Sequence, residues 1–147
     1  MPTVQTFRYP ASIEPGDESG FVVSFPDVPE AITEGDTREA AIAMGADALG
    51  LALLVYAREG RPLPKPRAKG EFVPIAVDPD VAAKLAVLDA FGRSGMTKTE
   101  LARRLRKDEK EVRRILDPMH PTKLAAMTEA LGVLGRRLVV GVEDAAA

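Results

Sequence analysis

The 147-residue sequence contains no cysteine and one histidine. Without thiols it forms neither disulfide bonds nor thiolate metal sites, and His120 alone cannot build a histidine metal site. It has no Gly-rich phosphate loop and no nucleophile motif. Its first residues lack the charged-then-apolar pattern of a signal peptide, and the longest apolar run, around Gly50 to Ala57, is far too short to span a bilayer. We therefore expect a cytosolic protein without metal, cofactor or membrane partner.

Charge is distributed unevenly along the chain, although the formal net charge is only −2. Residues 1–70 hold 7 Lys and Arg against 10 Asp and Glu, whereas residues 97–137 hold 11 against 6. This asymmetry predicts two modules with different partners, because a basic part suits phosphates and an acidic part suits a basic protein. The length fits one large domain or two small ones, and we divide the chain into residues 1–77 and 78–147.

The first half of the chain has the pattern of a small antiparallel sheet. Three stretches separated by short polar turns predict a meander: Val4–Ile13, Gly20–Phe25 and Ala31–Gly35. Pro10 predicts that the first strand lies at an edge of the sheet or ends there. A last strand, Phe72–Val77, follows the extended proline-rich segment Arg61–Arg67.

A long helix is expected between the third and fourth strands. Asp36 or Thr37 caps this helix, which runs to about Arg58 before Gly60 ends it. One apolar stripe should cover the sheet: Ala40, Ala41, Met44, Ala48, Leu51, Ala52 and Val55. Further apolar residues lie on other faces, so we expect the helix to meet a partner chain as well.

The stretch Thr97–Asp117 predicts two short helices joined by a tight turn. Thr97 and Glu100 fit a capping box, and Asp108 is a good cap for the second helix. The spacing of the apolar residues is that of a helix-turn-helix: Leu101, Ala102, Leu105, Val112, Ile115 and Leu116. Such a motif places its second helix in the DNA major groove. A plain solvated helical bundle remains the alternative.

The side chains that this core does not use are mostly basic, and we predict that they bind DNA. Lys110 and Arg113 lie one turn apart on the second helix and suit bases or phosphates, and we add Arg114 to this set. Three more residues suit phosphates: Lys98, Arg103 and Lys107. Asp108 and Glu109 could accept from a cytosine amine, although capping is the commoner use. Arg106 stands where Gly is frequent, and a left-handed backbone there costs about 1 kcal/mol.

The remaining elements should flank this motif. A helix from about Val81 to Arg93 should turn four apolar residues inward: Ala82, Leu85, Leu88 and Phe91. A last helix, capped by Thr122 or His120, should close the bundle with four more: Leu124, Met127, Leu131 and Leu134. Leu138–Val142 is strand-like, and pairing with its own copy across a two-fold axis would give it a partner. We therefore expect a homodimer or homotetramer.

Several of these motifs resemble the HicB-type antitoxins of type II toxin–antitoxin systems. Their strand ending in F-P-D-x-P is found at Phe25–Pro29, and their T-x-G-D-T turn into a helix with E-A is found at Thr33–Ala40. Three further features are also similar to the family: the helix end and proline segment Glu59–Pro64, the C-terminal helix-turn-helix, and the ending from Leu131 to Val140.

The resemblance implies an α+β protein. Its first part would be a degenerate RNase H-like βββαβ module without nuclease activity, and its second an all-α helix-turn-helix domain with a short C-terminal strand. The first would bind and block a HicA-type mRNA endonuclease toxin. The second would dimerise and bind a palindromic operator, repressing the operon. Within the motifs, we take four residues as candidates for toxin contact: Phe25, Asp27, Glu34 and Asp36.

Two other functions compete with this one. An RNase H-type nuclease needs a carboxylate cluster for a divalent metal. The first predicted strand offers none, and four acidic residues lie in predicted turns instead: Glu14, Asp17, Glu18 and Asp27. We therefore expect no enzyme. A stand-alone helix-turn-helix transcription regulator, whose sheet module senses a ligand or a protein, remains the second interpretation.

Overall fold

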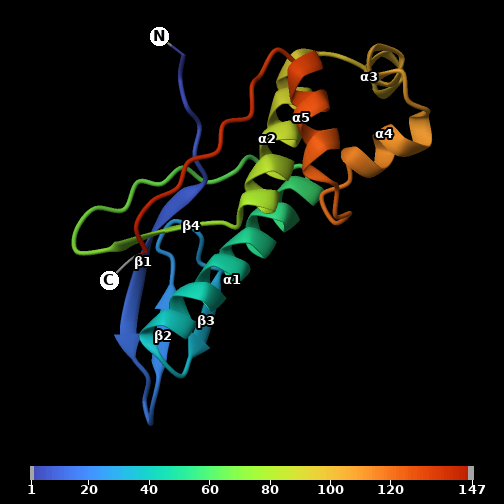
Figure 1. Ribbon diagram of the computed structural model, residues 1–147. Coiled ribbons are helices and arrows are strands. Elements are labelled where there is room, and N and C mark those ends of the chain that lie inside the picture. The colour runs from blue at the N-terminus through green and yellow to red at the C-terminus, as the bar shows by residue number, and fades with distance from the viewer. Residues whose placement is uncertain (1, 146–147) are drawn as a thin grey trace.

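The computed structural model describes residues 2–145 (Figure 1). Its first part is a four-stranded antiparallel sheet with the order β3-β2-β1-β4. The strands are β1 Arg8–Pro15, β2 Phe21–Ser24, β3 Ile32–Gly35 and β4 Val73–Ala76, and α1, Arg38–Arg58, connects β3 to the proline-rich segment before β4. The predicted βββαβ order is therefore confirmed.

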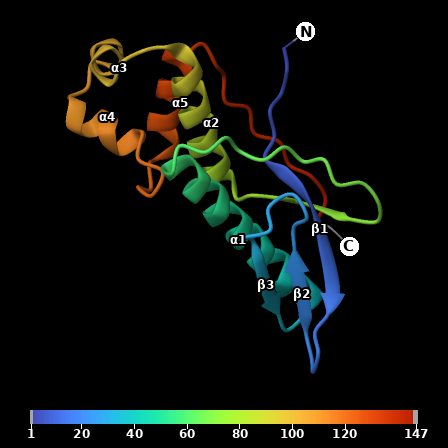
Figure 2. The same cartoon turned by 180° about the vertical axis from the view of Figure 1, so that it is seen from behind.

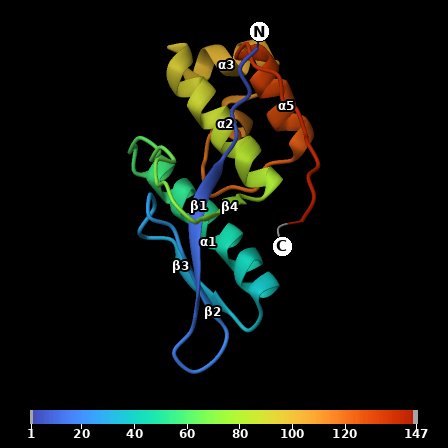
Figure 3. The ribbon, with the colours of Figure 1, turned by 90° about the vertical axis from the view of Figure 1, so that its left-hand side faces the viewer.

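Four further helices follow the sheet module. They are α2 Pro79–Ser94, α3 Lys98–Leu105, α4 Glu109–Ile115 and α5 Leu124–Val133. Figure 3 shows them gathered at one end of the molecule, whereas the β1–β2 hairpin extends to the other end. A sheet module followed by a helical module confirms the α+β class.

Strand β1 lies inside the sheet, so the edge position predicted from Pro10 is wrong. The first half of β1, from Arg8 to Ala11, pairs with β4, and the second half, from Ser12 to Pro15, pairs with β2. Pro10 lies opposite Pro74 and outside the register with β2. Because each half of β1 pairs on one side only, a residue without an N–H is accommodated in an interior strand.

Helix α1 has the predicted bounds, but another of its faces covers the sheet. Thr37 caps it by accepting from the Ala40 N–H at 3.0 Å. The buried residues are Ala41, Gly45, Leu49, Gly50, Ala52, Leu53 and Tyr56. Met44 and Leu51, which were expected to face the sheet, are 46% and 59% exposed. A Cβ at Gly45 would lie 2.9 Å from Val23 Cγ1, so the helix approaches β2 along a glycine that a count of apolar side chains ignores.

The 21 residues of α1 are long and apolar enough to cross a membrane by length and composition. The apolar run around Gly50 to Ala57 therefore underestimates the length of the apolar stretch, which extends over the whole helix. One face of α1 packs on the sheet here, and the core helix of a soluble protein passes the same test.

Helix α2 contributes to two hydrophobic clusters. Leu85 packs with the sheet and α1, whereas Ala83, Val87 and Ala90 pack with α3, α4 and α5. Leu85 is thus buried as predicted, while the other three residues expected to point inward are half-buried: Ala82, Leu88 and Phe91. Because α2 packs on two sides, its buried residues do not follow a single stripe.

The last helix and the tail depart from the prediction. Lys123 is the N-cap residue of α5 and makes no side-chain capping bond, so neither Thr122 nor His120 caps this helix. Met127 and Leu131 are buried and Leu134 is half-buried, but Leu124 is 50% exposed.

Residues 138–142 form no strand, contrary to the expected C-terminal strand. The tail runs back beside β1 and β4 (Figure 2), where Glu143 pairs with Arg8 at 2.6 Å. Val139 and Val140 are each 67% exposed. One isolated segment gains no hydrogen-bonded ladder within a single chain.

Candidate nucleic-acid interface and acidic surface

The predicted caps of α3 and α4 and the tight turn between these two helices are present in the structure. Thr97 accepts from the Glu100 N–H at 3.1 Å at the start of α3, and Asp108 accepts from the Glu111 N–H at 2.8 Å at the start of α4. Arg106, the C-cap of α3, has φ 56° and ψ 43°, in the left-handed region. Short-range hydrogen bonds therefore determine both helix starts, and the turn is formed at the cost of a left-handed arginine.

Helices α3 and α4 are packed as one unit. Leu101 and Ala102 of α3 and Val112 and Ile115 of α4 are all 5% exposed or less, in one cluster with α2 and α5. At the surface, the Thr99 hydroxyl donates to Glu109 Oε1 at 2.6 Å. The apolar spacing in the sequence therefore corresponds to a real interface between the two helices.

Most of the predicted DNA-binding side chains are exposed on this unit. Lys98, Arg103, Lys110, Arg113 and Arg114 are exposed, and Lys107 is half-buried. Arg103 and its neighbour Arg104 lie 3.6 and 2.9 Å from Glu100 Oε1. Within residues 2–145, no ion pair engages the three basic residues of α4, Lys110, Arg113 and Arg114. These cations can therefore meet an external anion without breaking an internal pair.

The two acidic residues predicted at the same interface have partners within the chain. Asp108 caps α4, and Glu109 accepts from Thr99. Both carboxylates lie at the start of α4, where the positive end of the helix dipole stabilises negative charge. Their contact with DNA stays a prediction.

One functional candidate, Lys84 of α2, is not among the residues predicted from the sequence. Its side chain is buried, with 4% of the residue exposed, and Nζ donates to Arg114 O at 3.2 Å, Ile115 O at 2.7 Å and Thr122 Oγ1 at 2.7 Å. Burial lowers the pKa of Lys84 to about 8, although the Asp117 carboxylate nearby favours its charged form. The only sequence signal is a lysine among apolar neighbours in α2, which is usually a surface position.

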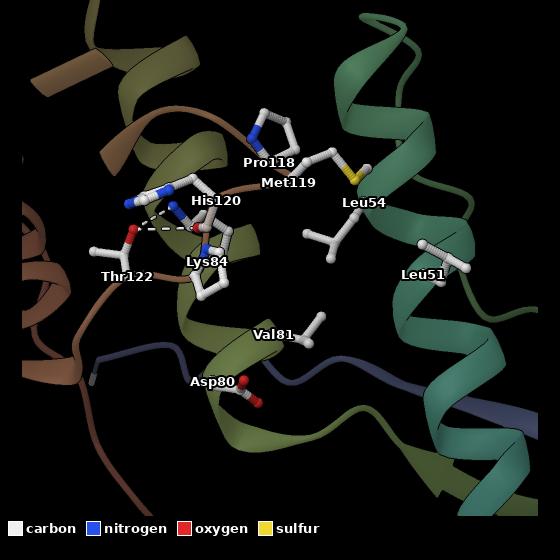
Figure 4. Close-up of a pocket in the computed structure, with 10 residues that line it drawn as sticks. Leu51, Leu54, Asp80, Val81, Lys84, Pro118, Met119, His120 and Thr122 are labelled. Atoms are coloured by element: carbon white, nitrogen blue, oxygen red, sulfur yellow. Dashed lines mark hydrogen bonds between the residues drawn. The ribbon is translucent and has the colours of Figure 1, made fainter. Parts of the chain in front are cut away.

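Lys84 and the loop between α4 and α5 line a cavity of about 280 Å³ (Figure 4). Leu51 and Leu54 of α1 form the opposite wall. His120 lies in this loop, where its carbonyl accepts from Thr122 Oγ1 at 3.3 Å. The single histidine therefore belongs to the loop that follows α4.

A second candidate surface lies at the far end of the sheet module. Five acidic residues line one open depression, which we call the acidic hollow: Glu14, Asp17, Glu18, Glu34 and Asp36. All five are exposed. Met44, on the outer face of α1, lines the same hollow. Two of the four residues proposed for toxin contact, Glu34 and Asp36, are therefore brought together here.

The other two proposed toxin-contact residues have structural roles. Phe25 is 1% exposed and lies in the core of the sheet module. Asp27 accepts from the N–H groups of Arg67 and Ala68, each at 3.1 Å, and so anchors the proline-rich segment. The F-P-D motif is therefore accounted for, at these two positions, by packing and loop attachment.

The same segment is held at its beginning by Tyr56. Its hydroxyl donates to Glu30 Oε1 at 2.9 Å, and this bond holds the pKa of Glu30 below its ordinary value. The Arg61 guanidinium lies 3.9 Å from the centre of the Tyr56 ring.

Within the described residues, no three acidic or histidine side chains are grouped so that they could hold a metal ion.

The sequence is similar to known antitoxins over nearly its whole length. A model of the HicB-like antitoxins of bacterial toxin–antitoxin systems matches residues 8–85. The chain is 39% identical over 140 residues to antitoxin HicB 1 of Photorhabdus laumondii, and the aligned part covers 95% of this chain and 90% of that protein. It is 38% identical over 134 residues to antitoxin HicB of Escherichia coli K12, covering 89% and 96%. Antitoxin HicB of Pseudomonas fluorescens is 36% identical over 143 residues, covering 95% and 96%.

These matches include the sheet module, the proline-rich segment and the start of α2, and the relatives extend through most of the helical module. The resemblance seen in the motifs is thus confirmed for the family. The chain belongs to the HicB-like antitoxins of bacterial toxin–antitoxin systems.

Proposed function

We propose that this antitoxin binds and neutralises a HicA-type mRNA endonuclease through residues 1–77. Residues 78–147 bind a palindromic operator as a dimer or higher oligomer and repress the operon. The observation that carries the proposal is the placement of opposite charges at opposite ends of the molecule (Figure 1): the acidic hollow lies on the sheet module, and α4 carries three cations that form no ion pair within residues 2–145. We assign the chain no catalytic role and a cytoplasmic location.

The DNA-binding half of the proposal rests on α4. This helix is capped, packed on α3 and carries Lys110, Arg113 and Arg114 on its exposed side. Arginine pairs bidentately with guanine edges, and both arginine and lysine bind phosphates. A two-fold dimer would place two copies of α4 on half-sites about 34 Å apart.

Alanine at both Lys110 and Arg113 tests this half. The double variant should lose operator binding in a gel-shift titration and keep its affinity for the toxin. Its matched control is Lys65→Ala with Lys69→Ala, which removes two exposed cations from the sheet module. Unchanged operator affinity of the α4 variant, or equal losses in both variants, would contradict the assignment.

The toxin-binding half rests on the acidic hollow and on Met44 beside it. Negative charge around an apolar side chain suits a basic protein surface, because complementary charge steers association and apolar contact adds affinity. Charge reversal at Glu34 and Asp36 should weaken toxin binding by at least about tenfold, measured by calorimetry at low salt. Glu71→Lys with Glu129→Lys is the control, since both residues are exposed elsewhere. Equal affinities for the two variants would place toxin recognition on another surface.

A further inference from the structure

The buried ammonium of Lys84 joins α2 to the C-terminal end of α4. An ammonium group has three donors and no acceptor, and here each finds an oxygen: two carbonyls at the end of α4, and the Thr122 hydroxyl in the loop that follows. Figure 4 shows the contact with Thr122. Both carbonyls belong to the last turn of α4, where backbone N–H partners are few, although Arg114 O also accepts from the Asp117 N–H at 3.2 Å. Lys84 therefore completes the hydrogen bonding of this helix end from another helix.

A lysine at this position is costly unless it is fully bonded. Burial of an ammonium group removes its hydration, and lysine is almost never fully buried without partners. The negative end of the α4 dipole and the Asp117 carboxylate both favour the positive charge. A satisfied buried polar group fixes one geometry more strictly than apolar packing, because displacement leaves donors and acceptors unpaired.

Helix α4 needs such an anchor because it is short. It has seven residues, and Val112 and Ile115 hold only its inner face. Apolar contacts are non-directional and tolerate small rotations and slides. The polar contact from Lys84 restrains the end of α4. Lys84 belongs to α2, which also packs against the sheet module through Leu85.

We propose that Lys84 is a positioning residue for operator recognition, which holds α4 in one orientation so that Lys110 and Arg113 meet the base edges in register. This inference rests on the proposed DNA binding. Lys84 itself, 4% exposed, is not a phosphate ligand. Its loss should therefore reduce discrimination between sequences more than the electrostatic affinity for any duplex.

The test compares Lys84→Met with Lys123→Met in the full chain. Methionine has nearly the same length and no charge, and Lys123 is an exposed lysine in the loop close to Thr122. Affinities are measured for a duplex from the protein's own promoter and for a scrambled duplex, over a series of salt concentrations. In Lys84→Met the ratio of the two affinities should fall by roughly tenfold or more, whereas the salt slope should not change. Lys123→Met should keep the ratio.

A second readout does not need DNA. Amide hydrogen exchange should accelerate in α4 of Lys84→Met and remain as in the wild type in α1 and in the sheet. Acceleration throughout the chain, or none in α4, would overturn the positioning role, as would a local acceleration with an unchanged affinity ratio. If the wild-type chain ignores its promoter, the proposed DNA binding fails, and normal exchange in α4 of Lys84→Met would then reject the anchor as well.

Should Lys84→Met fail to fold, Thr122→Val replaces it. This variant removes one of the three oxygens and leaves the lysine in place. It should produce the same two effects at smaller size. A fully wild-type affinity ratio and exchange pattern in Thr122→Val would then count against the anchor.

Discussion

The Thr99 hydroxyl donates to the Glu109 carboxylate at 2.6 Å and so joins the first turns of α3 and α4. The carboxylate also lies at the helix start that would face DNA phosphates. Glu109→Gln keeps an acceptor for Thr99 and removes one negative charge. Because the electrostatic part of DNA affinity depends on net charge near the phosphates, operator affinity at low salt should rise by about threefold to tenfold. Gel-shift titrations of both proteins would measure it. An unchanged affinity would place this helix end away from the DNA, and a lower affinity would show that the carboxylate itself contributes to binding.

Arg106 is the one non-glycine residue with positive φ among residues 2–145. Glycine adopts this backbone without a Cβ penalty, so Arg106→Gly should raise the free energy of unfolding by about 1 kcal/mol. Thermal unfolding should shift upward by roughly 2–4 °C for a chain of this size. Arg104→Gly, inside α3, is the control and should lower stability by about 1 kcal/mol. A destabilised Arg106→Gly would show that the arginine side chain contributes more than its backbone costs.

Two glycines inside helices respond oppositely to alanine. A Cβ at Gly45 would meet Val23 Cγ1 at 2.9 Å, whereas one at Gly92 would meet nothing within 4 Å. Gly45→Ala should therefore destabilise the protein by about 1–3 kcal/mol through overpacking. Gly92→Ala should stabilise it by roughly 0.5–1 kcal/mol, because alanine loses less backbone freedom. Urea unfolding distinguishes the two, and equal effects would mean that α1 moves away from β2 at little cost.

The buried Lys84 should give stability a specific pH dependence. Its pKa falls from 10.5 to about 8 in the folded chain, so between these values the unfolded chain binds more protons. The free energy of unfolding contributed by this group therefore rises with pH over that range and is constant below it. Lys84→Met lacks this contribution but keeps both tyrosines, so their effect on stability at high pH is the same in the two proteins and cancels in the comparison. The difference in melting temperature, wild type minus variant, should increase from about pH 8 to pH 10. A difference in melting temperature that stays constant over this pH range would contradict a lowered pKa of Lys84.

The sequence by itself determined the features that depend on neighbours along the chain. Thr97 and Asp108 cap helices because their oxygens reach an N–H three residues ahead. Alternating apolar residues and polar turns were enough to predict the order of the strands and the long helix along the chain, and the family motifs were readable directly. The charge division between the halves is likewise a property of the sequence, and it alone indicates two partners of opposite charge.

Only the tertiary structure decided what depends on packing between distant segments. The face of α1 that covers the sheet follows from the close approach of Gly45 to Val23. The interior position of β1 follows from the pairing of its first half with β4 and its second half with β2. The role of Asp27 depends on a segment 40 residues later in the chain. Lys84 belongs to the same group, because its oxygens come from α4 and the following loop. A local pattern cannot contain such partners, since they become neighbours only when the helices pack.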